Sequence, residues 1–140
     1  MPQSKELTIR IEDQPGALGK CCRVLADRGV NILAFQAHEW EGMGLIRMVV
    51  DTVATAKALL DAEQIYYTET DVVQIGLPHR PGELSRVASR LGEARININY
   101  AYCGTEPKSN MPLLVFGVTD AARAATLLDK FAQEEIAKTA

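Results

Sequence analysis

Two short turns of the same composition carry the residue types best suited to holding a ligand. Gln14-Pro15-Gly16-Ala17-Leu18 recurs as Arg80-Pro81-Gly82-Glu83-Leu84, at an offset of 66 residues. A strand-like segment precedes each Pro-Gly pair, and a helical pattern follows it, so we expect each proline in the first turn of a helix. The first N–H groups of a helix lack internal partners and lie at the positive end of its dipole. Each turn is therefore a candidate site for a carboxylate.

The polar groups around the turns suit the ammonium of a zwitterion as well as its carboxylate. Asp13 precedes the first turn and can accept a hydrogen bond from an ammonium. Asn31-Ile32 recurs as Asn97-Ile98 at the same offset, and an asparagine amide offers both a donor and an acceptor. The sequence therefore predicts that a free amino acid binds here. The candidate contacts are Asp13, Gln14, Gly16, Ala17, Leu18, Asn31, His79, Arg80, Gly82, Glu83, Leu84 and Asn97.

The two turns differ at charged positions, so the two sites cannot be chemically equal. The differing pairs are Asp13 and His79, Gln14 and Arg80, and Ala17 and Glu83. Asp13 can offset an ammonium, whereas Glu83 would repel a carboxylate brought near the second helix start. Arg80 favours the second turn, because a guanidinium can hold a carboxylate in bidentate fashion. We rank the first turn slightly ahead of the second.

The elements that position these turns follow the same order in both copies. The first copy has strand patterns at 7–12, 31–38, 45–50 and 66–70 and helical patterns at 18–25 and 54–60. The helix stripes place Leu18 and Leu84 with the core residues. The second copy has strands at 73–77, 97–102 and 113–118 and helices at 84–91 and 121–131, with no convincing strand afterwards. We predict an α+β chain of two ferredoxin-like βαββαβ modules, with antiparallel sheets and helices on one face. The expected modules are residues 1–70 and 71–140, the second without its last strand.

The doubled motif resembles the signature of the ACT domain family. It stands as Asp13-Gln14-Pro15-Gly16-Ala17-Leu18 with Val30-Asn31-Ile32, and as His79-Arg80-Pro81-Gly82-Glu83-Leu84 with Ile96-Asn97-Ile98. The resemblance implies allosteric amino-acid binding between paired modules. It places the first loop with Asn97 and the second loop with Asn31. The leading function is then a non-catalytic amino-acid sensor. The alternative is a regulatory subunit that docks on a partner enzyme of amino-acid metabolism without binding a ligand itself.

Composition excludes several other classes of protein. Hydrophobic residues make up 47% and the formal net charge is −3, so nothing draws the chain to nucleic acid or to an anionic membrane. No apolar run approaches a membrane span, and the N-terminus does not read as a signal peptide. The cysteines Cys21, Cys22 and Cys103 form no disulfide framework, so we expect a reducing cytoplasm. No catalytic, cofactor or metal motif is present, and we expect neither an enzyme nor a cofactor.

Two structural questions stay open at the level of sequence. The Pro-Gly turns can be scaffolding that starts a helix, and the asparagines can satisfy only turn backbone.

Cys21 and Cys22 fit core packing better than redox chemistry. Leu113, Val115 and Phe116 place apolar side chains on both faces of one strand, so we expect a homodimer that covers the second face.

Overall fold

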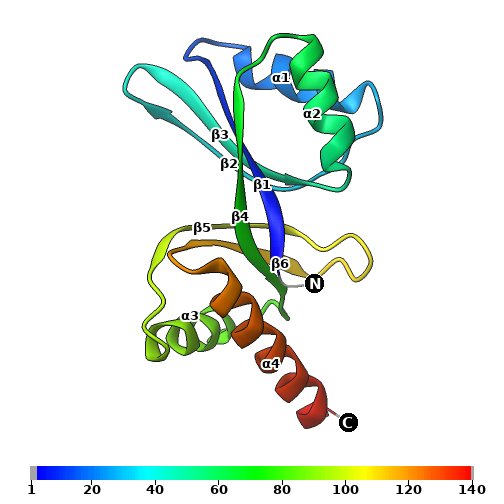
Figure 1. Cartoon of the computed structure of the whole chain (residues 1–140). Helices are drawn as coiled ribbons and strands as arrows, with labels where there is room; N and C mark the ends of the chain where they lie inside the picture. Colours follow the sequence, from blue (N-terminus) through cyan, green and yellow to red (C-terminus); the bar gives the residue numbers. More distant parts are fainter. Residues whose placement is uncertain (1–2, 140) are drawn as a thin grey trace. The chain divides into compact units, whose positions relative to one another are not determined.

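The strand and helix patterns form ten elements within residues 3–139, the part of the chain that this computed structural model describes. The strands are β1 (Gln3–Glu12), β2 (Ile32–Trp40), β3 (Met43–Val50), β4 (Tyr67–Gly76), β5 (Ile98–Thr105) and β6 (Pro112–Val118). The helices are α1 (Ala17–Ala26), α2 (Val53–Ala62), α3 (Glu83–Glu93) and α4 (Ala121–Thr139). They divide into two units, which are described separately (Figure 1).

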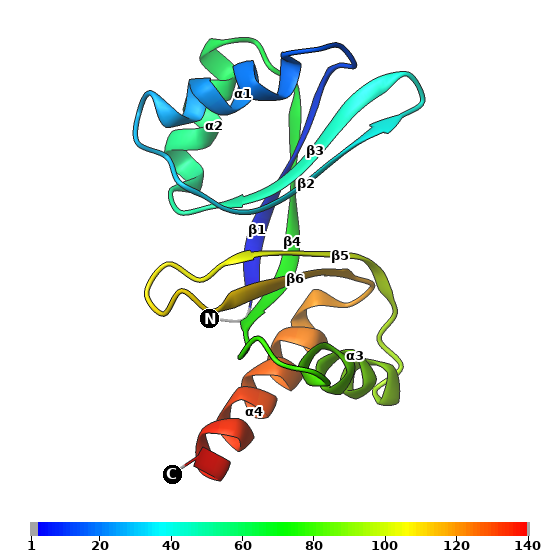
Figure 2. The ribbon, with the colours of Figure 1, turned by 180° about the vertical axis from the view of Figure 1, so that it is seen from behind.

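The first unit comprises Lys5–Thr70. Its central strand is β3, which pairs antiparallel with β1 on one side and β2 on the other. The N–H of Arg10 donates to the carbonyl of Tyr66 at 3.1 Å, which sets the start of β4 beside β1. Both α1 and α2 lie on one face of this sheet (Figures 1 and 2). The core between them is formed by Leu7, Ile9, Cys21, Leu25, Val30, Ile46, Met48, Val50, Ala56 and Leu60.

The second unit comprises residues 71–139 together with Gln3 and Ser4. Here β6 is central and pairs antiparallel with β4 and β5. Both α3 and α4 lie on one face of this sheet (Figure 2). Its core is formed by Val73, Ile75, Leu77, Val87, Leu91, Ile96, Phe116, Ala124, Leu128 and Phe131. The predicted ferredoxin-like α+β fold, with antiparallel strands and helices on one face, is confirmed in both units.

β4 is one uninterrupted strand, and the division between the units falls within it, between Thr70 and Asp71. The sequence has no glycine or proline at this point that would end the strand. The same element therefore serves as the last strand of one unit and the first strand of the next.

α4 continues to Thr139, and no strand follows β6 within the described residues. Its end is attached to α3 by ion pairs. The guanidinium of Arg90 donates to Glu134 at 2.9 Å, and that of Arg86 donates to Glu135. Both guanidinium groups also lie 5.3 Å from the ring centre of the buried Phe131. No described helix is long and apolar enough to cross a membrane.

Candidate functional site

The first Pro-Gly turn is a type II β-turn that ends where α1 begins. The N–H of Ala17 donates to the carbonyl of Gln14 at 3.2 Å, and Gly16 has φ 88° and ψ −12°. A type II turn requires positive φ at its third residue and accepts proline at its second. Pro15 therefore lies in the turn before the helix, whereas we had expected it in the first helical turn. This assignment corrects the sequence interpretation.

The second turn has the same geometry. Gly82 has φ 89° and ψ −13°, and the N–H of Glu83 donates to the carbonyl of Arg80 at 3.4 Å. The hydrogen bond in each turn occupies one of the N–H groups proposed to hold a carboxylate, at Ala17 and at Glu83. Of the N–H groups proposed for that role, those of Gly16 and Leu18 are left at the first turn. Those of Gly82 and Leu84 are left at the second.

A pocket of about 220 Å³ opens beside the first turn. Four of the predicted residues line it, namely Asp13, Gln14, Ala17 and Leu18. Leu18 is 38% exposed, so it borders this pocket and does not join the core as we had expected. The other lining residues are Ile11, Glu12, Ala37, His38, Glu39, Gly44, Leu45 and Ile46. The structure thus brings the first loop together with the end of the β2–β3 hairpin.

Sequence reasoning missed Glu12, His38 and Glu39 as site residues. Strand pairing places them here, because His38 lies opposite Leu45 and Glu39 opposite Gly44. The expected hairpin gave a signal that could have found them, since it sets the end of β2 beside Gly44 and Leu45 at the start of β3. Gly44 is required for close approach, because a Cβ there would lie 2.8 Å from Cγ1 of Ile11.

The charges of this pocket are suited to an ammonium at one side and a carboxylate at the other. Its lining includes the carboxylates of Glu12, Asp13 and Glu39, and none of its twelve residues is Lys or Arg. Glu39 already accepts a hydrogen bond from the N–H of Gly42 at 2.8 Å. The start of α1 supplies the complementary partial positive charge. The arrangement can hold a zwitterion without any side-chain cation in the pocket.

The second turn is chemically different because it carries a buried carboxylate of its own, that of Glu83. Glu83 is 7% exposed. Its carboxylate accepts hydrogen bonds from Arg80 Nε at 2.9 Å and from Arg86 Nη1 at 3.3 Å. Leu84 is 56% exposed and, like Leu18, stays out of the core that we expected it to join. His79 and Gly82 are also exposed in this turn.

The two asparagines begin β2 and β5 through their backbone groups. The N–H of Asn31 donates to Asp51 Oδ1 at 3.0 Å, and its carbonyl accepts from the N–H of Asp51 at 3.0 Å. The carbonyl of Asn97 accepts from the N–H of Thr119 at 3.2 Å, and its side-chain amide donates to Asn99 at 2.9 Å. Both residues are exposed. The pairing of each asparagine with the loop of the other module stays a prediction.

Family models account for both halves of the chain. Residues 72–135 match the ACT domain, and residues 7–68 match the AHAS small subunit-like ACT domain. The chain is a tandem ACT domain protein. Each ACT module contains one of the two Pro-Gly turns. No curated protein matches the chain in sequence.

Solved structures show the same tandem ACT fold. Protein BT0572 from Bacteroides thetaiotaomicron has a TM-score of 0.81 and 26% identity, over 93% of this chain and 89% of that one. The ligand-free regulatory subunit of aspartate kinase from Thermus thermophilus has a TM-score of 0.62 and 18% identity, over 92% and 91%. That subunit from Thermus flavus has a TM-score of 0.57 and 18% identity, over 93% and 92%. At 18% identity the likeness is one of fold alone.

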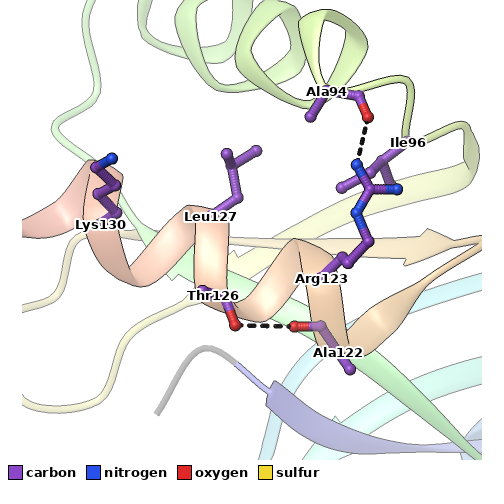
Figure 3. Close-up of a pocket in the computed structure, with 7 residues that line it drawn as sticks. All are labelled: Ala94, Ile96, Ala122, Arg123, Thr126, Leu127 and Lys130. Carbon is purple, nitrogen blue, oxygen red and sulfur yellow. Dashed lines mark hydrogen bonds between the residues drawn. The ribbon is translucent and has the colours of Figure 1, made fainter.

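A second pocket, of about 430 Å³, lies in the second ACT module between the end of α3 and α4. Figure 3 shows Arg123 extending from α4 to the carbonyl of Ala94, a hydrogen bond of 2.7 Å that caps the end of α3. The remaining lining residues are Ile96, Ala122, Thr126, Leu127 and Lys130. None of the predicted ligand contacts lies here, so this pocket is not the site that the ACT motif marks.

The cysteines and acidic residues of the ACT modules form no metal centre. Among the described residues, no group of three His, Cys, Asp or Glu side chains is placed to hold a metal ion. Cys21 lies in the first core, where burial, and then the neighbouring Cys22, raise the pKa of its thiol to about 11. A thiol of such high pKa is a poor nucleophile at neutral pH.

Proposed function

We propose that this tandem ACT protein is a regulatory protein that binds a small free amino acid at its first Pro-Gly turn. The observation that carries the proposal is the pocket beside that turn. It is lined by Ala17 and Leu18 from the start of α1 and by Glu12, Asp13 and Glu39, whose carboxylates can accept a hydrogen bond from an ammonium. The ligand's carboxylate would face Gly16 and Leu18, and its ammonium would face Asp13.

The role of the chain is proposed to be non-catalytic and cytoplasmic, reporting an amino-acid level to a partner enzyme of amino-acid metabolism. Two of its structural neighbours are regulatory subunits of aspartate kinase, which supports a regulatory use of this fold. The alternative is a subunit that docks on such an enzyme without a ligand. A homodimer is part of both proposals.

Thermal denaturation with each common amino acid at millimolar concentration separates these two proposals. A ligand well above its dissociation constant raises the melting temperature, because it binds only the folded state. We expect one amino acid, or a few of similar shape, to do so. No response to any amino acid would favour the docking subunit.

Binding calorimetry with the amino acid that most raises the melting temperature locates the site. Asp13→Asn should weaken binding roughly tenfold, since a hydrogen bond to a charged group contributes about 1.5–3 kcal/mol. The control is Asp27→Asn, at the other end of α1. Asn97→Ala should weaken binding roughly 10- to 150-fold if its amide contacts the ligand. An affinity unchanged by substitution at Asp13, Gly16 and Asn97 alike would place the site elsewhere.

A further inference from the structure

The carboxylate of Glu83, in the first turn of α3, is held by two arginines, Arg80 and Arg86. Arg80 Nε lies 2.9 Å from Oε1, and Arg86 Nη1 lies 3.3 Å from Oε1 and 3.4 Å from Oε2. Glu83 is 7% exposed, although it is a charged residue in the first turn of a surface helix. Glutamate is almost never buried unless it is paired. The two arginines provide that pairing.

The first turn has the same backbone but lacks this carboxylate. Gly16 and Gly82 differ by one degree in φ and one in ψ, and α1 and α3 begin at the next residue. At the offset of 66 residues, Ala17 stands where the second turn has Glu83. The cation one helical turn further on is present in both copies, as Lys20 and as Arg86. Residues three apart on a helix are neighbours, so Lys20 is adjacent to Ala17 as Arg86 is to Glu83.

A ligand carboxylate at the second turn would have to compete with Glu83 for Arg80 and Arg86. To enter, it must displace Glu83 from both arginines and leave that carboxylate buried without a partner, which is strongly unfavourable. Arg86 is held further by Glu135, whose hydrogen bond raises the pKa of the guanidinium and fixes its position. At the first turn nothing has to be displaced, and the 220 Å³ pocket opens beside it.

We propose that Glu83 is a built-in carboxylate that fills the second turn, so that each chain binds one amino acid, at the first turn, where Lys20 pairs with its carboxylate. The filling of the second turn stands on its own. The single ligand and the role of Lys20 rest on the proposed function.

Chemical rescue tests the filling without any amino acid. Glu83→Ala removes the atoms of an acetate ion from the turn and takes from Arg80 and Arg86 the carboxylate that they share, while Arg86 keeps its contact with Glu135. We expect its melting temperature to fall by roughly 5 °C or more, and sodium acetate to restore part of that loss where sodium chloride of equal ionic strength does not. Glu83→Gln loses the same charge but keeps the space filled, so acetate should not rescue it. Glu93→Ala, at the far end of α3, is the control for loss of an acid.

The acetate experiment has a clear contrary result. If acetate and chloride affect Glu83→Ala equally, or if acetate also rescues Glu83→Gln, the turn does not hold a carboxylate and the proposal is wrong. A melting temperature unchanged by Glu83→Ala would also overturn it.

Calorimetry with the amino acid selected by thermal screening tests the number of ligands per chain and the role of Lys20. We expect one ligand per chain in the natural protein and up to two in Glu83→Ala. Lys20→Met should weaken binding roughly two- to fivefold, the range of an exposed ion pair, and Lys20→Arg should restore it. Two ligands per natural chain, or full affinity in Lys20→Met, would refute these two points. If no amino acid binds while acetate still rescues Glu83→Ala, the proposed function fails and the filled turn stands.

Discussion

The backbone N–H of Ala17 donates a hydrogen bond to the carbonyl oxygen of Gln14, across 3.2 Å. That bond closes the turn in which Gly16 takes a φ of 88°. A Cβ at Gly16 would meet no other heavy atom within 4 Å, so glycine is needed for its conformation and not for space. A larger residue at Gly16 would therefore disturb the backbone of the turn as well as any ligand bound beside it.

Gly16→Ala should lower the free energy of unfolding by about 1–2 kcal/mol, because an L-residue at positive φ brings its Cβ close to the backbone. Gly19→Ala is the matched control, three residues further along α1. Gly19 has ordinary helical φ and open space for a Cβ, so alanine there should raise the free energy of unfolding by roughly 0.5–1 kcal/mol. Urea denaturation measures both, and changes of the same sign would contradict the turn assignment.

The fold could be predicted because strand alternation and helical periodicity indicate the same order of elements in both copies. Strand alternation and helix stripes recur at one offset, and each copy supplies an apolar face to the other elements of its module. Leu18 and Leu84 were the exceptions. Periodicity places Leu18 on the stripe of Cys21 and Leu25, but Leu18 borders the pocket and is 38% exposed. The period of the apolar residues does not say which of them join the core and which line an open pocket.

The site was predictable only in its local part. The Pro-Gly loops are contiguous in sequence, whereas His38 and Glu39 reach the first pocket through strand register. Glu83 was predicted to repel a carboxylate, and its pairing with Arg86 was overlooked although the two are three residues apart. The contact of Arg86 with Glu135 joins residues 49 apart in sequence and depends on how α4 packs.

Self-association stays a prediction, and part of its basis has changed. Leu113 and Val115 were expected to need a second copy, but they are 3% and 0% exposed in the single chain. We therefore expect Val115→Asp to unfold the protein and not only to split a dimer. The exposed large apolar side chains include Phe35, Trp40, Met43 and Tyr66 of the first unit, which can still support an interface. Light scattering that shows a monomer at all practical concentrations would contradict the dimer.

Alkylation rates should separate the three cysteines by their surroundings. Cys103 is exposed and should react first with iodoacetamide at pH 8. Burial raises the pKa of Cys22, and that of Cys21 to about 11, so about one Cys21 thiol in a thousand would be ionised at that pH. We expect Cys21 to be modified only when the chain unfolds. Mass spectrometry of the digested protein follows each site, and rapid modification of Cys21 in the folded chain would contradict its place in the core.

The end of α4 should lose its attachment to α3 in acid. Hydrogen bonds from Arg90 and Arg86 hold the pKa values of Glu134 and Glu135 below the ordinary value for glutamate. A carboxylate with a lowered folded-state pKa stabilises the fold above its unfolded pKa, and that contribution is lost as pH falls through the folded value. The two ion pairs should therefore be intact at neutral pH, and their contribution should be lost as pH falls from about 4.5 toward the lowered folded-state pKa values.

Amide hydrogen exchange of residues 132–139, corrected for intrinsic rates, measures this loss between pH 6 and pH 3.5. We expect protection of these amides to fall in acid while that of the buried strand β6 changes less. The double variant Glu134→Gln/Glu135→Gln should already lack the protection at pH 6 and show little further change on acidification, because the two carboxylates that hold this end of α4 have been removed. If the natural protein and the double variant lose protection equally over this range, ion pairs with Arg86 and Arg90 do not hold the helix end, and packing of Phe131 alone must do so.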